Sequence, residues 1–185
     1  IEVNKMQIGL QDYPYTNVKD ETVDAIKTTD YPHSEIHEGN AFLYCEVTDF
    51  SNGAVRDILI VTPNTTKWAH MILDVVSESE ADLKIYEAPT ASNNGTAVTE
   101  FNRNRNSATV NTTVITHTPT IAGGSEGTLI CQKHWGSGKA NGGESRNLTE
   151  WVLKQNTKYL LRVTNATTSA NQIEIDLNWY EHTNG

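Results

Sequence analysis

The chain has 185 residues, with 14 Lys and Arg, 23 Asp and Glu, and a formal net charge of −9 at pH 7. An acidic chain repels phosphate backbones, so this charge argues against non-specific binding of nucleic acid. Hydrophobic residues make up 37% of the chain and charged residues 20%, while Thr, Asn, Ser and Gly supply much of the remainder. Because Thr favours strands and Asn, Ser and Gly favour turns, the composition predicts an all-β domain with many tight connections.

The acid excess is concentrated early in the chain, since residues 1–100 hold 17 Asp and Glu against 6 Lys and Arg. This part of the chain is suited to meeting a basic protein surface. No apolar run approaches the ~20 residues that a membrane-spanning helix needs. We therefore predict no membrane partner, and the sequence shows no signal peptide.

Residues 1–33 are predicted to form an extended N-terminal arm. Apolar residues recur from Ile1 to Leu10, and Pro14 and Pro32 favour extended backbone before them. A short helix with an acidic first turn is expected over residues 20–26, although it is too short to be stable alone. An arm of this kind gains order by lying on a partner.

Residues 34–185 are predicted to form one β-sandwich domain, jelly-roll-like in its strand pattern. No long helical pattern separates the strands, and turn signals such as Ser51-Asn52-Gly53 and Asn93-Asn94-Gly95 lie between them. Alternation of apolar and polar residues indicates strands over residues 41–48, 58–62, 68–76, 83–87, 97–102, 110–117, 129–135, 151–153, 159–163 and 172–182.

The final strand shows the clearest alternation in the chain. Its predicted inner face consists of Ile173, Ile175, Leu177 and Trp179, and its predicted outer face of Glu174, Asp176 and Asn178. In the first strand of the domain, the apolar residues that share one face are Ala41, Leu43, Cys45 and Val47. One buried face and one solvated face for each strand is the pattern expected of a sandwich.

The two cysteines, Cys45 and Cys131, are too few for a disulfide scaffold. Each lies in an alternating apolar run, where a free cysteine packs as a small hydrophobe. A single disulfide between them is the open alternative. Asn-x-Thr sequons suggest a glycosylated secreted protein, but in an Asn- and Thr-rich chain we favour chance occurrence. They lie at Asn64, Asn94, Asn111, Asn147 and Asn165.

We predict a non-enzymatic protein with no catalytic, cofactor-binding or metal-binding residue. The six histidines show no metal-ligand motif; His33 and His37 are four apart, but the neighbouring Pro32 and Gly39 argue against a helix there. Glu181-His182 is interpreted as a strand end whose polar groups are satisfied by neighbours. The serines of the glycine-rich loops form no nucleophile elbow; these are Ser125, Ser137 and Ser145.

Two features leave a binding function open. Trp68 and Trp135 lie at strand ends, where exposed aromatic rings would suit a sugar-binding face, although aromatic residues in sandwiches are more often core. Arg103 and Arg105 share one direction if their segment is extended. They are either a solvated hairpin tip or partners for carboxylates across a subunit interface.

Six segments, taken in their order and spacing, carry a family resemblance. They are Ile36-His37-Glu38-Gly39-Asn40-Ala41-Phe42, Ile58-Leu59-Ile60-Val61-Thr62-Pro63, Asn102-Arg103-Asn104-Arg105-Asn106-Ser107, Trp151-Val152-Leu153-Lys154, and Tyr159-Leu160-Leu161-Arg162 with Trp179-Tyr180-Glu181-His182. In these segments the chain resembles the small decoration, or auxiliary head, proteins of tailed bacteriophages. No segment of residues 1–33 contributes to the resemblance.

The resemblance implies a structural virion protein on the outer capsid surface, assembled in the host cytoplasm. Such a protein binds and bridges subunits of the major capsid protein, commonly as a homotrimer, and stabilises the head without a cofactor. An acidic protein suits the outside of a DNA-filled shell. The alternative is a carbohydrate-binding sandwich on a virion appendage, with a role in host adhesion.

Overall fold

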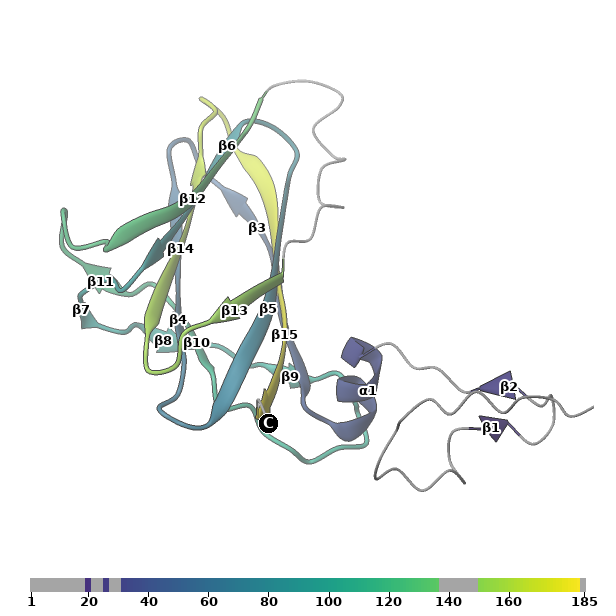
Figure 1. The fold of residues 1–185 in the computed structure, drawn as a ribbon. Helices are drawn as coiled ribbons and strands as arrows, with labels where there is room; N and C mark the ends of the chain where they lie inside the picture. The colour runs from purple at the N-terminus through teal and green to yellow at the C-terminus, as the bar shows by residue number, and fades with distance from the viewer. Residues whose placement is uncertain (1–18, 21–24, 27–30, 137–149, 184–185) are drawn as a thin grey trace, which may run out of the picture.

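The computed structural model describes residues 19–20, 25–26, 31–136 and 150–183. Two large antiparallel sheets pack face to face, which confirms the predicted all-β sandwich (Figure 1). The elements are β1 (Lys19–Asp20), β2 (Ala25–Ile26), α1 (Tyr31–Glu38), β3 (Ala41–Phe50), β4 (Val55–Val61), β5 (Lys67–Ser77), β6 (Ala81–Glu87), β7 (Ala91–Asn93), β8 (Thr96–Ala97), β9 (Phe101–Asn102), β10 (Val114–His117), β11 (Thr120–Ile121), β12 (Thr128–Trp135), β13 (Glu150–Leu153), β14 (Lys158–Asn165) and β15 (Asn171–Thr183).

The five-stranded sheet has the order β13-β5-β15-β3-β9, with β15 at its centre. In register, Trp179 of β15 lies between Phe42 of β3 and Met71 of β5, and all three side chains are buried. The predicted inner face of the last strand is confirmed, since Ile173, Ile175, Leu177 and Trp179 are at most 2% exposed. The period-2 pattern therefore identified the strand that holds this sheet together.

The six-stranded sheet has the order β12-β6-β14-β4-β10-β8. Its inner face supplies the second half of the core, with Ile58, Ile60 and Leu161 fully or almost fully buried. Leu59 and Leu160 lie opposite each other in β4 and β14, and they are fully buried on the other side of the sheet. The middle of this sheet is therefore buried on both faces.

The predicted apolar face of β3, with Ala41, Leu43, Cys45 and Val47, is the outer face of the sheet, although Ala41 at its end is buried. Val47 is 59% exposed and Cys45 is exposed, whereas Phe42 and Phe50, which alternate with them, are buried. The assignment follows from register, because Phe42 pairs with Trp179 of the inner face. Cys45 does not pack in the core, and neither cysteine forms a disulfide.

The helix expected over residues 20–26 is wrong at the residues that the structure describes there. Lys19 and Asp20 pair with Ala25 and Ile26 as two short antiparallel strands. The rest of the predicted arm up to residue 30 lies outside the described residues. A helix of about two turns without tertiary support gains too few hydrogen bonds to offset its nucleation cost.

A helix forms instead at α1, where the flanking Pro32 and Gly39 were expected to prevent one. Pro32 is the second residue of α1, in the first turn, where a missing backbone N–H is tolerated. Gly39 follows the last helical residue with φ 80°, the left-handed conformation that commonly ends helices. Both residues therefore mark the ends of α1 and do not interrupt it.

A buried carboxylate ties the 103–113 segment to the end of β15. Glu181 is 1% exposed and accepts hydrogen bonds from the backbone N–H groups of Thr112 and Thr113 at 2.7–3.0 Å. The Thr112 hydroxyl and Trp179 Nε1 donate to the same carboxylate at 2.6 and 3.2 Å. The sequence interpretation of Glu181 as a residue satisfied by its neighbours agrees with this geometry.

Candidate functional site

The outer face of the five-stranded sheet carries exposed apolar side chains from several of its strands. Alternation and pairing place Val47, Trp68, Phe101 and Val152 on this face. Val47, Val152 and Trp68 are 59%, 49% and 37% exposed. Exposed apolar residues gathered on one face are typical of a contact surface for another macromolecule.

Carboxylates run through the middle of this outer face. Asp74 of β5 lies opposite Asp176 of β15, and Glu174 lies two residues away on the same side of β15. Burial raises the pKa of Asp74 and of Asp176, and repulsion from Glu174 adds to both shifts. The centre of the face therefore holds crowded negative charge between apolar positions, a pattern that favours a basic partner.

Helix α1 packs at one end of this outer face. The ring of Tyr31 meets the ring of Tyr180 edge-on, with centroids 5.9 Å apart, and Tyr180 is only 8% exposed. The buried Glu35 of α1 accepts a hydrogen bond from Asn40 Nδ2 at 3.0 Å. The helix thus joins the predicted arm to the sandwich on the same face that carries the exposed apolar groups (Figure 1).

Beneath α1, four polar side chains from three strands form a hydrogen-bonded cluster, which we call the imidazole cluster: His70, Glu150, Tyr180 and His182. Tyr180 donates to Glu150 Oε1 at 2.7 Å, and His70 Nδ1 lies 2.5 Å from the same oxygen. The Nε2 atoms of His70 and His182 are 2.8 Å apart. The His70 ring also stacks on the Tyr180 ring at 4.7 Å.

The electrostatics of the imidazole cluster favour an ionised carboxylate. Burial alone would raise the pKa of Glu150, but hydrogen bonds from Tyr180 and His70 outweigh it and hold that pKa below its usual range. Burial, followed by the bond to Glu150, raises the pKa of Tyr180. The hydroxyl proton of Tyr180 therefore remains in place and points at Glu150.

A second histidine pair lies on the exposed side of α1. His33 and His37 are one helical turn apart, and their Nε2 atoms are 3.0 Å from each other. The prediction that Pro32 and Gly39 disfavour helical geometry here is wrong, because α1 spans both histidines. His117 and His134 lie elsewhere; His134 Nδ1 contacts Asp82 at 2.8 Å.

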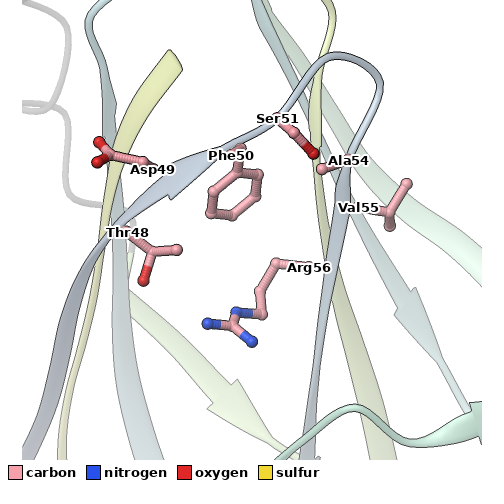
Figure 2. A pocket seen from close by; sticks show the side chains of 7 residues that line it. All are labelled: Thr48, Asp49, Phe50, Ser51, Ala54, Val55 and Arg56. Carbon is pink, nitrogen blue, oxygen red and sulfur yellow. The ribbon is translucent and has the colours of Figure 1, made fainter. Parts of the chain in front are cut away.

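A shallow pocket of about 190 Å³ opens where β3 turns into β4 (Figure 2). Phe50 and Arg56 extend into the space between the two strands. Arg56 is engaged already, donating to both carboxylate oxygens of Glu46 at 2.9 and 3.1 Å and so linking the two sheets. The pocket is smaller than the ~300–1,000 Å³ of drug-sized ligand sites, and its cation is paired, so it is a poor candidate for a small-molecule site.

The residues weighed for binding separate from one another in the structure. Trp68 is partly exposed and lies opposite His182 in register, whereas Trp135 packs against the core. Arg103 and Arg105 are both exposed, and the Arg105 guanidinium lies 5.2 Å from the centre of the Phe101 ring. The two tryptophans do not form one aromatic platform.

The sequons differ in whether a glycan could be attached. Asn165 is 1% exposed, and its Nδ2, the atom that a glycan would modify, donates to the carbonyls of Phe50, Ser51 and Ser169. Asn165 is therefore a structural residue of the β14–β15 turn. Asn64 and Asn94 are exposed, and Asn147 lies outside the described residues.

In the described part of the chain, no three His, Cys, Asp or Glu side chains converge in a way that could hold a metal ion. Within residues 31–136 and 150–183, no helix is long and apolar enough to cross a membrane. Comparisons with protein-family models, with curated proteins and with solved structures found no match for this chain.

Sequence reasoning missed the imidazole cluster because its members are far apart along the chain. His70, Glu150 and His182 meet only when β13, β5 and β15 are aligned in register. A partial signal existed, because His182 continues the alternation of Glu174, Asp176 and Asn178 along the last strand. The neighbouring strands that bring the cluster together could not be read from this segment alone.

Proposed function

We propose that this chain is a non-enzymatic structural protein of a virion, which decorates the outside of a phage capsid and bridges subunits of the major capsid protein. The observation that supports it best is the outer face of the five-stranded sheet. That face combines exposed Val47, Trp68 and Val152 with the carboxylates of Asp74 and Asp176. A mixed apolar and acidic face is suited to a protein surface that offers apolar and basic groups.

Charge complementarity favours a capsid exterior that presents Lys and Arg side chains. Asp74 and Asp176 are held close together at a cost in free energy, which a cation from a partner would relieve. A specific contact buries at least ~1,000 Å², so the whole sheet face and not the carboxylates alone must take part. The stabilisation is mechanical: each bridge adds contact area between subunits, and this contact must be broken before the shell can rupture.

The predicted arm supplies a second contact in this proposal. Its last residues, 31–33, begin α1, which packs on the outer face through Tyr31 and Tyr180. Two linked contacts bind more tightly than either does alone, because the second forms at high effective concentration. Deleting residues 1–30 is expected to leave the sandwich folded but to weaken attachment; unfolding of the truncated chain would show that the arm belongs to the core.

Trimer formation is part of the proposal, and the edge strand β12 is the surface that favours it. Among the strands that the structure describes, β12 pairs only with β6, and its Leu129 and Ile130 are 47% and 36% exposed. An edge strand with apolar side chains is prone to associate with another chain. The mass in solution tests this: a trimer that becomes monomeric in Leu129→Lys supports the edge contact, and a monomeric native chain rejects it.

The main test uses heads of the encoding virus assembled without this protein. Purified chain should bind these heads and restore their resistance to heat. The double variant Val47→Glu with Val152→Glu should bind at least tenfold more weakly, while Val114→Glu, an exposed valine on the other sheet, should bind normally. Heads that match intact virions without the protein, together with no binding of the purified chain, would refute the proposal.

The second candidate is a carbohydrate-binding sandwich on a virion appendage. Exposed Trp68, next to His182 in register, is the observation in its favour. Its weakness is that Trp135 packs against the core and does not extend the platform. A glycan-array screen at high protein concentration decides: binding abolished in Trp68→Ala supports this function, and no binding removes it.

A further inference from the structure

We propose that the imidazole cluster holds the first turn of α1 on the sandwich at neutral pH and releases it in acid, when both His70 and His182 are protonated. The Nε2 atoms of the two rings are 2.8 Å apart, which is the geometry of an N–H···N hydrogen bond. Histidine is the side chain that ordinarily changes its charge between pH 5 and pH 8. The proposal is independent of the capsid function proposed above.

When both rings are neutral, the hydrogen bonds of the cluster have one direction, which follows from counting protons. The carboxylate of Glu150 only accepts, so His70 Nδ1, 2.5 Å from its Oε1, carries the ring proton. The Nε2 atom of His70 is then an acceptor, and His182 Nε2 must donate to it. His182 in turn accepts at Nδ1, where the Tyr31 hydroxyl lies 3.1 Å away and donates. One chain of donors therefore runs from Tyr31 of α1 to Glu150 of β13.

The cluster can take up one proton while its heavy atoms stay in place. If His70 becomes an imidazolium, its Nδ1 still donates to Glu150, and its Nε2 now donates to His182. His182 keeps one ring proton, on Nδ1, and donates it to the Tyr31 oxygen. Tyr31 is 52% exposed, so its own hydroxyl proton can turn to water. Two hydrogen bonds reverse their direction, and α1 stays attached.

A second proton does not fit at the observed distance. Both Nε2 atoms would carry hydrogen, and because an N–H bond is about 1 Å long, the two facing protons would lie within about 1 Å of each other. Two positive rings with centroids 4.6 Å apart also repel each other. His70 is held by Glu150 and by stacking on Tyr180, so His182 is the ring that we expect to move.

Movement of His182 removes a contact of the first turn of α1. Tyr31 meets the sandwich through the rings of His182 and Tyr180, with centroids 5.5 and 5.9 Å away. The other end of the helix is held separately, because the His37 carbonyl accepts from Asn104 Nδ2 at 2.9 Å, a bond that ring protonation does not alter. Acid therefore frees Tyr31, where the predicted arm joins the domain, while the C-terminal end of α1 stays attached.

The charges around the two rings balance one added proton better than two. The charged and titratable groups that face the pair and Tyr31 are Glu35 and Glu38 of α1, Glu150 of β13 and Tyr180 of β15. Glu181, the neighbour of His182, is on the other face of β15, where it accepts from Thr112 and Thr113. Of these carboxylates, Glu150 is the one that accepts a hydrogen bond from a ring of the pair. One positive ring thus has a direct counter-ion, and a second has none.

Hydrogen exchange of the native full chain at pH 8 and pH 5 tests the proposal. In α1, the amides of residues 35–38 donate to carbonyls of the first turn. Their protection factors, which correct for the effect of pH on intrinsic exchange, should fall at least tenfold at pH 5, while those of β15 are retained. In His182→Gln, which cannot take up the second proton, the fall should be less than twofold.

The matched control is His33→Gln with His37→Gln, which removes the other close histidine pair, on α1 itself, and should keep the tenfold fall. Glu35 is present in every variant, so protonation of that carboxyl would lower the protection in all of them alike. Equal protection of native α1 at the two pH values would overturn the proposal. A fall that persists in His182→Gln, or one that disappears in the His33 and His37 variant, would also overturn it.

A second readout needs no variant, so misfolding cannot affect it. Long-range ¹⁵N–¹H spectra of the native chain at pH 8 show which ring nitrogen carries the proton, and we expect Nδ1 in His70 and Nε2 in His182. On acidification, both rings should become imidazolium over the pH range in which α1 loses protection. Two rings that are both protonated while α1 keeps its protection would refute the release.

Discussion

Asp74 and Asp176 occupy directly opposed positions in neighbouring strands β5 and β15, with both carboxylates on the outer face of the sheet. Like charges opposite each other across a strand pair are destabilising by roughly 0.2–1 kcal/mol. Burial raises the pKa of both carboxyls, repulsion from Glu174 adds to both shifts, and repulsion from Asp74 adds to that of Asp176. The isolated chain is therefore less stable at this point than a neutral sheet would be.

The first prediction follows from that pair. Asp176→Asn should raise the free energy of unfolding by roughly 0.2–1 kcal/mol at pH 7, because it removes the repulsion and keeps the side-chain shape. Urea denaturation measures the change. Glu78→Gln, which removes an exposed charge elsewhere, is the control and should have little effect. A less stable Asp176→Asn variant would show that the carboxylate has a stabilising partner.

The second prediction concerns Glu181. Glu181→Gln should lower the free energy of unfolding by about 1–3 kcal/mol, since an amide has one acceptor oxygen for donors that the carboxylate now satisfies with two. Thr112→Ala removes only the hydroxyl donor and should cost less. Equal effects of the two substitutions would mean that, in Glu181→Gln, the backbone N–H groups of Thr112 and Thr113 form hydrogen bonds with water.

The third prediction compares two glycines with positive φ. Gly124 has φ 81° and open space around it, so Gly124→Ala should cost only the roughly 1–2 kcal/mol of a left-handed residue. Gly95 has φ 91°, and an added Cβ would lie 2.2 Å from the backbone oxygen of His117. Gly95→Ala should therefore lower the thermal midpoint further, and equal midpoints would contradict the close approach.

The fourth prediction is a pH dependence. The pKa of Glu150 is lowered in the folded state from its usual 4.5, so its contribution to stability is present above that value and is lost as the pH falls through the folded-state pKa. Between pH 6 and pH 3, Glu150→Gln should lose less stability than the native chain. Parallel curves for the two proteins would show that the hydrogen bonds from Tyr180 and His70 do not favour the ionised form.

Asp74 and Asp176 act in the opposite direction over the same acid range. Their pKa values are raised from 3.8, so the folded state binds these protons more readily and gains relative stability as the pH falls. The contribution of Glu150 to the pH dependence must therefore be measured as the difference in folding free energy between the native chain and Glu150→Gln, not from the native chain alone. In an Asp176→Asn background, the free energy of unfolding should fall more steeply on acidification, because one of the carboxyls that opposes the loss has been removed.

How far the sequence predicted the structure depended on whether a pattern was local. The alternation from Ile173 to Trp179 identified a strand and its buried face, because one face alone is apolar. In β3 both faces carry apolar residues, and only pairing with β15 shows that Phe42 points inward and Val47 outward. Pro32 and Gly39 were interpreted as breakers because their positions at the ends of α1 were unknown.

The binding groups were harder to predict than the fold. The imidazole cluster combines residues from three strands, and its hydrogen bonds depend on register, which no single segment specifies. The exposed face required the same information, since exposure of Val47 and Val152 follows from which side of the sheet faces the core. The proposed capsid function rests on the resemblance and on this face, and the head-binding experiment is its test.

The central place of β15 has a consequence for how the chain folds. β3 and β5 do not pair with each other; each pairs along its length with β15, which follows both far along the chain. Neither can complete its ladder in a nascent chain before β15 has been made. Pairing at such long sequence separation slows folding, so we expect refolding in the millisecond-to-second range that non-local β proteins show. Until β15 pairs with them, the unpaired edges of β3 and β5 can pair with other chains, so aggregation competes with folding.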